Sequence, residues 1–485
     1  MLAAFTNLAN DGITPNNNTA VRTTYYYVKF KPQDFAQYET LHQDTTLNLS
    51  DFPIESNILQ NGNRYHDPSL PDSVPTYQYT AVKVGYQFDE NIPYEIIDNL
   101  YIPETDENLQ YKTGGTNDVY VEKLLNKAYI QTANYEDTIA IDTNEAAYLA
   151  KSYRPGGRIQ INDSRLNRNI GMQGVRMQAR RWFVVYHAIC DFNGNYRMLF
   201  SFNRPCNYSA WFATPTFTVT QNFFGTTFWI NGPKTSSDWN HDINDGYDRF
   251  AGHVFRGAFR YHFRDIGGLQ RPYLIGMRQR YQAINDFRTW SGINWIVFPV
   301  IKVARFGNTD QGVREYLSDE VFSTTCHETA HSSHFLRMGS IGKFILVNAQ
   351  LRESWAVAIE WELTFIEYAE RGVANYGKEN YFPLPIPPQF PNSYAYQYWT
   401  RGVHDAQYTP IYIDIVDWHN QLNRLYPERA NGSIADSIGG YRLWDIERFS
   451  LSFILNHDHL RLVLKGNKPT GVTDANIDLL INQYN

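Results

Sequence analysis

The chain has 485 residues, of which 43% are hydrophobic and 15% aromatic, so it can bury substantial cores in about two to four domains. Its 43 Lys and Arg stand against 50 Asp and Glu, a formal net charge of −7 without a long charged block, which argues against nucleic acid or an anionic membrane surface as a partner. No apolar run of about 18 residues occurs, so we expect no transmembrane segment.

Residues 1–22 are polar and rich in Asn, which predicts a flexible lead-in. They lack the basic start and the long apolar stretch of an export signal. The composition, rich in Tyr, Asn and Thr with only 19% charged residues, favours an exported protein. We therefore expect a secreted, periplasmic or cell-surface protein whose export signal is absent from this chain; a cytosolic protein is the alternative.

Residues 23–108 read as a small α+β module. Tyr25–Lys31 and Tyr77–Val84 are rich in Tyr and Val, which is typical of strands. Residues 109–155 are largely polar around one expected helix, 117–128, and we interpret them as a linker region.

Residues 156–220 predict a β module. The stretch Val175–Phe183 alternates over most of its length as a half-buried strand does. An Asn-Gly pair within Asp191–Tyr196 suits a tight hairpin. Met198–Phe202 and Phe217–Thr220 are expected to be further strands. The order of these motifs resembles the transthyretin-like, carboxypeptidase-regulatory type of β-sandwich, which implies a structural support or an adhesive module.

Two features of this module leave alternatives open. The pair Arg180-Arg181 beside Trp182 can bind a ligand by charge and stacking, or it is a solvated strand face. Cys190 and Cys206 flank the expected hairpin and either pair with each other or are two buried free thiols.

Residues 221–485 are expected to form a mostly helical catalytic domain. One strand, Asn294–Val303, precedes the chemically most informative motif of the chain. Pro299 within it fits an edge strand, and a sheet edge there can pair with an extended peptide.

That motif is His327-Glu328-Thr329-Ala330-His331. Two His at i and i+4 lie on one face of a helix and can bind the same metal ion, and Glu328 can serve as general base toward water. Ser318 or Asp319 can cap the expected helix, and Gly339 follows its basic last turn. A surface helix that carries two His by chance is the alternative; Cys326 is expected to pack rather than to bind metal.

A third metal ligand is expected on a second predicted helix, Leu351–Glu362. Glu353 and Glu360 are two turns apart on nearly the same face and in apolar surroundings, where an ionised carboxylate needs a partner. His334 follows His331 too closely for a third ligand and is expected to be a neighbouring surface or supporting residue.

The motif followed by Glu353-Ser354-Trp355-Ala356 resembles the gluzincins, zinc peptidases in which the Glu that opens the second motif binds the metal. The resemblance implies one Zn²⁺ per chain held by His327, His331 and Glu353, with Glu360 orienting a ligand His. The alternatives are Glu360 as ligand, or Glu360 as an exposed helix carboxylate.

Gluzincins often supply a downstream Tyr or His that stabilises the oxyanion. The chain offers several such residues, among which the sequence does not choose: Tyr394, Tyr396, Tyr398, His404, Tyr408, Tyr412 and His419.

Taken whole, the chain resembles secreted or lipoprotein zinc metallopeptidase-like proteins of Bacteroidetes type, on the stretches Tyr25–Lys31, His66–Pro68 and Tyr77–Lys83, the β module and the metal helix. The resemblance implies a zincin-like catalytic domain, a polypeptide substrate and attachment to the cell surface through an N-terminal lipid anchor that this chain lacks. A catalytically idle surface binding or adhesion protein and a zinc hydrolase of non-peptide amides or esters are the alternatives.

Overall fold

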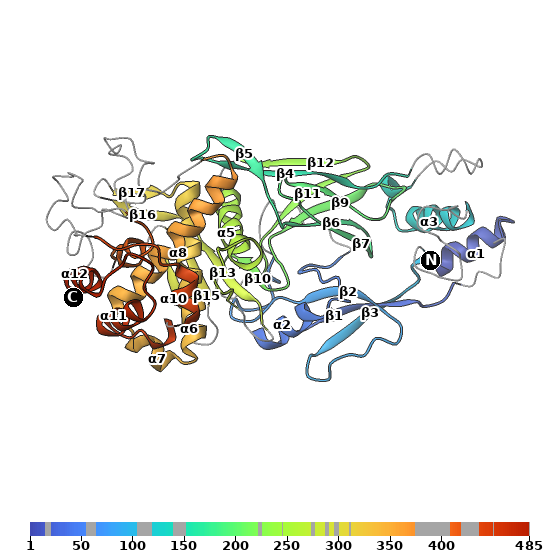
Figure 1. Ribbon diagram of the computed structural model, residues 1–485. Helices are drawn as coiled ribbons and strands as arrows, with labels where there is room; N and C mark the ends of the chain where they lie inside the picture. The colour runs from blue at the N-terminus through green and yellow to red at the C-terminus, as the bar shows by residue number, and fades with distance from the viewer. Residues whose placement is uncertain are drawn as a thin grey trace. The chain divides into compact units, whose positions relative to one another are not determined.

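The computed structural model describes residues 1–14, 21–54, 65–103, 119–138, 152–221, 226–244, 246–272, 277–286, 291–294, 300–309, 312–373, 408–418, 436–449 and 451–484. The chain forms two compact units (Figure 1). Unit 1 comprises Met1–Asn162, Arg168–Arg249 and Gly276–Arg278, and unit 2 comprises Asp163–Asn167, Phe250–Ile275 and Gln279–Asn485. As predicted, helices and largely antiparallel sheets are mixed, and the C-terminal region is mostly helical.

The first sheet of unit 1 has the order β2-β1-β3, with β1 (Tyr25–Phe30) between β2 (Gln78–Lys83) and β3 (Tyr94–Leu100). This confirms the two strands predicted for the first module. Val28 and Phe30 alternate toward one face and pack with Leu41 of helix α2, Phe35–Gln43. The α2 helix begins where the Asp34 carboxylate accepts the Gln37 N–H at 2.9 Å.

Helix α1 (Leu2–Asn10) occupies part of the segment expected to be a flexible lead-in. Ala4 and Leu8 lie one turn apart and are buried in a cluster with residues of helix α3, Val119–Gln131. A short 3-10 turn, Tyr135–Asp137, follows α3. The apolar spacing of α1 is visible in the sequence, but the helix is stabilised by packing against a partner helix more than 100 residues away.

Two further sheets of unit 1 make up the β region. One has the order β11-β9-β6-β7, and the other has the order β12-β4-β5 with β8 paired to β4. Their strands are β4 (Gly156–Asp163), β5 (Arg168–Gly171), β6 (Arg176–Arg181), β7 (Val184–Ile189), β8 (Asn195–Arg197), β9 (Cys206–Trp211), β11 (Trp229–Thr235) and β12 (Trp239–Ile243). Strand β10 (Phe217–Thr220) is also present, as predicted. The strands continue to Ile243, past the expected module end at residue 220.

Two local expectations for this region are wrong. The Asn193-Gly194 turn joins β7 of one sheet to β8 of the other, so it does not close a hairpin. Gly194 has φ +83°, and a Cβ there would lie 2.0 Å from the Ile159 carbonyl oxygen, so the close approach of β4 requires glycine. Met198–Phe202 is not a strand, and only Phe202 forms a bridge, with Tyr153. Turn chemistry is local, whereas the pairing partner depends on the whole sheet.

Cys190 and Cys206 are buried free thiols, one of the two alternatives left open by the sequence. The Tyr153 hydroxyl donates to the Cys206 sulfur at 3.1 Å. Burial raises the pKa of the Cys206 thiol to about 11, so it stays protonated and inert near neutral pH.

Unit 2 contains a sheet in which β15 (Val300–Ala304) lies between β13 (Gln279–Ile284) and β14 (Gly292–Asn294). The β13 strand is parallel to β15, and β14 is antiparallel to it. The single strand expected over Asn294–Val303 is therefore wrong, because Asn294 and Val300 pair with each other across two strands. Pro299 lies outside the described residues. A separate hairpin is formed by β16 (Phe306–Thr309) and β17 (Gly312–Glu315).

The remaining elements of unit 2 are mostly helices: α5 (Gly246–Phe263, of which the first residues belong to unit 1), α6 (Ser318–Met338), α7 (Ile341–Leu346), α8 (Ala349–Glu370), α9 (Ile411–Asp414), α10 (Leu443–Phe449), the 3-10 turn Leu451–Phe453, α11 (His457–Gly466) and α12 (Asp474–Tyr484). Helices α6 and α8 lie side by side (Figure 1) and contribute to one large apolar core. Gly257 of α5 allows close contact with α6, because a Cβ there would lie 2.7 Å from the Thr325 Cβ.

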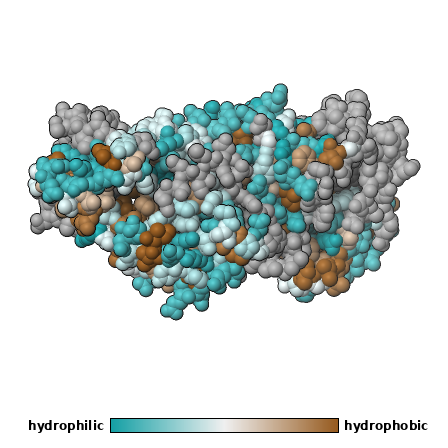
Figure 2. Space-filling view, turned by 180° about the vertical axis from the view of Figure 1, so that it is seen from behind, coloured by the Kyte–Doolittle hydropathy of each residue, from teal (hydrophilic) through white to brown (hydrophobic). Residues whose placement is uncertain are grey.

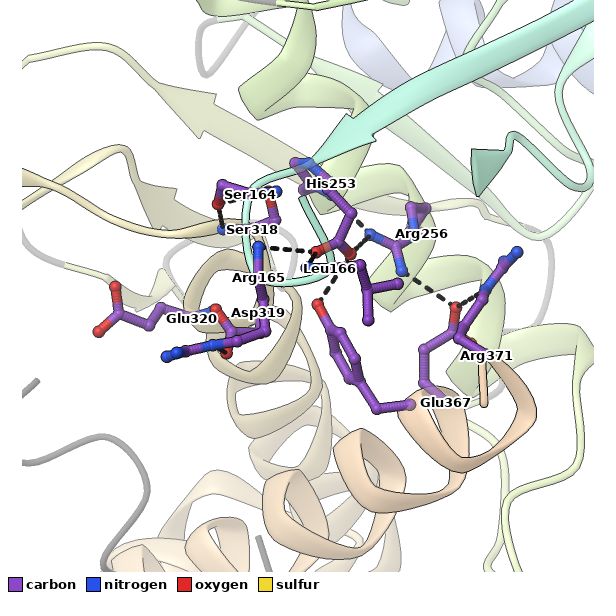
Figure 3. A network of polar contacts seen from close by, with 12 residues as sticks. Ser164, Arg165, Leu166, His253, Arg256, Ser318, Asp319, Glu320, Glu367 and Arg371 are labelled. Carbon is purple, nitrogen blue, oxygen red and sulfur yellow. Dashed lines mark hydrogen bonds and ion pairs between the residues drawn. The ribbon is translucent and has the colours of Figure 1, made fainter. Parts of the chain in front are cut away.

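A buried network of charged side chains holds these helices together (Figure 3). The Arg256 guanidinium contacts the Asp163 carboxylate at 3.0 Å and the Glu367 carboxylate at 3.1 Å. Arg165 of the same loop as Asp163 reaches Asp319 at the start of α6, at 2.7 Å. The network therefore ties the start of α6 and the end of α8 to the segment Asp163–Asn167, and together with apolar packing it fixes the relative position of the two helices.

Exposed large apolar side chains form separate patches on the surface seen in Figure 2. Two groups of such residues lie on β3, at Ile96 and Ile97, and on α7, at Ile345 and Leu346. No helix in the described part of the chain is long and apolar enough to cross a membrane.

Candidate metal centre

The motif helix α6 begins at Ser318, after Leu317, so the sequence prediction of its start is correct to within one or two residues. Leu317 is the N-cap, not Ser318 or Asp319. The Glu320 carboxylate accepts the Leu317 N–H at 2.7 Å, and Glu320 also pairs with Arg314. The helix ends at Gly339, which has φ +72° as expected for a glycine that terminates a helix.

Side chains between and beyond the two His anchor α6 to neighbouring elements. The Thr329 hydroxyl lies 3.0 Å from the Tyr281 hydroxyl of β13, and Tyr281 in turn lies 3.0 Å from His262 of α5. The Ser332 hydroxyl donates to the Gln279 side chain at 3.0 Å. These contacts orient the helix about its axis, so that the faces bearing His327 and His331 point away from β13.

Helix α8 brings a carboxylate to the two His side chains. Glu353 Oε2 lies 2.9 Å from His331 Nε2 and 3.6 Å from His327 Nε2. The three donor atoms all lie within 4.8 Å of one another, and the two imidazole rings are nearly perpendicular. The cluster can hold a metal ion.

Glu360 lies on the other side of the His327 ring. Its Oε2 is 3.1 Å from His327 Nδ1, whereas the Nε2 of the same ring is directed to Glu353. A carboxylate at Nδ1 holds the proton there and leaves the Nε2 lone pair available. Glu360 is 9% exposed, so the alternative of an exposed helix carboxylate is wrong.

Glu328 lies between the two His residues in the sequence. Its side chain is buried, with 7% of its surface exposed. Burial raises the pKa of its carboxyl, and His327 and His331 oppose the increase. A buried carboxylate with a raised pKa is a better proton acceptor than a solvated one, which suits a general base.

The electrostatics of the cluster favour a cation. Burial lowers the pKa of His327, but Glu360 and Glu353 outweigh this effect and raise it well above its usual value. Burial raises the pKa of Glu353, and contacts with the two His residues reverse this and lower it. Together with Glu328, three carboxylates surround two imidazoles. Two nitrogen donors and one carboxylate oxygen form the donor set of a catalytic zinc site, so these residues fit that ion.

Ser354 has a role that the sequence did not reveal. Its hydroxyl lies 2.8 Å from the Thr409 hydroxyl and accepts the Thr409 N–H at 3.0 Å. This pair holds the neighbouring Tyr408, whose ring centroid is 6.1 Å from that of His327. Ser354 directly follows Glu353, and this adjacency was the only signal in the sequence.

Of the other expected oxyanion donors, Tyr412 lies in the core of unit 2, 1% exposed and edge-on to Trp355 at 5.3 Å. Tyr394, Tyr396, Tyr398, His404 and His419 lie outside the described residues.

Only 1% of His334 is exposed, so the expectation of a surface residue is wrong and the alternative of a supporting residue remains. Its ring packs against Phe344 at 5.3 Å, and burial together with His331 lowers its pKa to about 3. Cys326 is buried with its sulfur facing the Gly257 carbonyl at 3.8 Å, as expected for a packing residue.

No family model matches the chain, and no curated protein matches it significantly.

Proposed function

We propose that this protein is a zinc-dependent peptidase of the gluzincin type. One observation carries the proposal: His327 Nε2, His331 Nε2 and a Glu353 oxygen converge from two helices, with the Glu328 carboxyl buried beside them. His327, His331 and Glu353 would hold the ion. A bound Zn²⁺ supplies Lewis acidity, which acidifies water and polarises a carbonyl.

The chain's own residues supply the proton transfers and the orientation. Glu328 accepts a proton from the attacking water and returns it to the leaving amine. Glu360 keeps the His327 ring in one tautomer through Nδ1, at 3.1 Å. Tyr408, whose ring centroid lies 6.1 Å from that of His327 and whose neighbour Thr409 contacts Ser354, would donate its hydroxyl to an oxyanion.

The substrate edge in this proposal is β14, Gly292–Asn294. It ends the described part of the sheet beyond β15, and both strands contact α6. An extended polypeptide can add to such an edge through main-chain hydrogen bonds, which do not depend on side-chain identity. A polypeptide is therefore a better substrate for this arrangement than a small amide or ester.

The test measures zinc content and cleavage of a fluorescence-quenched peptide library in the wild type and in Glu328→Gln. We expect about one zinc per chain in both proteins and a loss of turnover of about 100-fold or more in the variant. Glu362→Gln removes a charge from the same α8 helix outside the cluster, and it should retain full turnover.

Three outcomes contradict the proposal. If the protein stays metal-free after incubation with zinc, the proposed metal site is wrong. Unchanged turnover in Glu328→Gln removes the general base. If the wild type binds zinc but cleaves no peptide, the protein is instead an idle binding protein or a hydrolase of other amides or esters.

A further inference from the structure

Unit 1 contains a cavity of about 700 Å³ that the proposed peptidase chemistry does not use. Its walls come from five segments: the start of α1, residues 21–23 before β1, the end of β3 with the residues that follow it, one face of α3 with the residue just after it, and the turn between β6 and β7. A volume of this size is typical of sites for small organic molecules.

The inner wall carries a buried cation, Arg181. Only 4% of Arg181 is exposed, and its guanidinium donates to the Tyr129 hydroxyl at 2.7 Å. Burial and the neighbouring Arg204 lower its pKa to about 9, so the group is still charged near neutral pH. Arg204 itself pairs with the Glu122 carboxylate. An anion in the cavity would therefore stabilise the charge of Arg181.

Aromatic and aliphatic side chains supply much of the remaining lining, including Leu125, Ile102 and Phe183. Trp182 stacks on Tyr129 with ring centroids 5.9 Å apart, and its indole N–H donates to Asp137 at 3.1 Å. The indole plane is thus fixed at the cavity wall before any ligand arrives.

The backbone at Trp182 is strained. Trp182 is the first residue of the two-residue turn between β6 and β7 and has φ +51°. Hairpin turns favour Gly or Asn at such a position, and strained non-glycine residues concentrate at ligand sites. The turn therefore places Arg181 and Trp182 at one cavity at the expense of local backbone stability.

We propose that this cavity binds a free small organic anion, a carboxylate carried on an apolar or aromatic body. The carboxylate would pair with Arg181 and the apolar body would lie among Trp182, Leu125 and Ile102. Arg22 and Asp98 also line the cavity but are exposed, whereas Arg181 is a buried cation in its wall. The proposal concerns unit 1 alone and does not depend on zinc or on peptidase activity.

The test uses the full chain and two probes, 3-phenylpropionate and the isosteric neutral amide 3-phenylpropionamide, with binding measured by calorimetry. We expect the wild type to bind the carboxylate at least tenfold more tightly than the amide. Arg181→Gln should weaken binding of the carboxylate about tenfold or more and leave binding of the amide nearly unchanged.

The neighbouring Arg180 provides a matched control. Its guanidinium points to the other side of β6 and donates to the Ile54 carbonyl at 2.8 Å. Arg180→Gln should bind both probes as the wild type does. Ala128→Phe places a large side chain into the cavity from α3 without removing a charge, so it should abolish binding of both probes. This variant keeps the proposal testable if Arg181→Gln fails to fold.

The proposal is overturned if the wild type binds neither probe at millimolar concentration or binds the two equally. It is also overturned if a folded Arg181→Gln, or a folded Ala128→Phe, binds the carboxylate as tightly as the wild type.

Discussion

His327 Nδ1 and Glu360 Oε2 lie 3.1 Å apart, on the side of the imidazole opposite to the edge that faces Glu353. The two carboxylates of α8 therefore contact different nitrogens of one ring. Because the Nε2 atoms of both His residues converge on Glu353, the geometry favours the proposed role of Glu353 as ligand and of Glu360 as support for the His327 ring.

The first prediction separates the two carboxylates. Glu353→Ala removes a donor atom, so we expect zinc affinity to fall by more than it does in Glu360→Ala, where the loss should be about 10- to 100-fold. Competition with a chromogenic chelator measures both affinities. Glu362→Ala on the same helix is the control and should bind zinc as the wild type does. The reverse order of the two effects would make Glu360 the ligand.

The second prediction tests the contact between α5 and α6. In Gly257→Ala the new Cβ would lie 2.7 Å from the Thr325 Cβ and 2.9 Å from the Phe322 carbonyl oxygen, so the helices must move apart. We expect a loss of about 2 kcal/mol or more in the free energy of unfolding, measured with urea. Gly342→Ala in α7 meets no atom within 4 Å and should be neutral or slightly stabilising. Equal effects of the two substitutions would show that α5 and α6 are not in close contact at Gly257.

The third prediction concerns the buried charge network (Figure 3). Glu367 is 4% exposed and contacts Arg256 and Arg371, each at 3.1 Å, so Glu367→Gln removes a buried anion from both arginines, although Arg256 keeps its contact with Asp163. We expect about 3–5 kcal/mol of destabilisation in thermal or chemical unfolding. Glu370 also pairs with arginines, but its side chain is 31% exposed, so Glu370→Gln should cost about 1 kcal/mol or less. A neutral Glu367→Gln would exclude the network as a determinant of stability.

The fourth prediction is a pH dependence at Glu447. Burial raises the pKa of this carboxyl to about 7. The Gln270 N–H, which donates to it at 2.6 Å, and the charge of Arg337 act in the opposite direction but do not cancel the effect of burial. The folded state thus binds this proton more tightly than the unfolded chain, whose Glu pKa is about 4.3. The stabilisation that protonated Glu447 contributes is fully present below the unfolded-state pKa and is lost as the pH rises through about 7.

The measurement is the free energy of unfolding of the wild type and of Glu447→Gln across this range. The difference between the two proteins isolates Glu447 from other buried acids. Relative to the variant, the wild type should lose about 3 kcal/mol between about pH 4 and pH 8. Parallel pH profiles would mean that Glu447 has an ordinary pKa in the folded state.

Much of the candidate site was predictable from the sequence, because it depends on local geometry. The i, i+4 spacing of His327 and His331 places them on one helix face wherever the helix lies. Gly339 marks the end of α6 for a similarly local reason, since a residue with φ +72° is most often glycine.

Features that depend on distant partners were not predictable in the same way. The strand signal over Asn294–Val303 is real, but the chain reverses within it, and only pairing with the neighbouring strand shows this. The Asn193-Gly194 turn is likewise a true turn that leads to another sheet. Propensity describes one segment, whereas hydrogen-bond partners come from other parts of the chain.

The sequence by itself determined the donor types of the site and reduced the third ligand to Glu353 or Glu360, because two helical turns bring both carboxylates to one face. Only the tertiary structure shows that Glu353, and not Glu360, lies near the Nε2 atoms of both His residues, which favours Glu353. The choice depends on how α8 is positioned against α6, and that position depends on apolar packing and on ion pairs with a loop and a helix far away in the sequence.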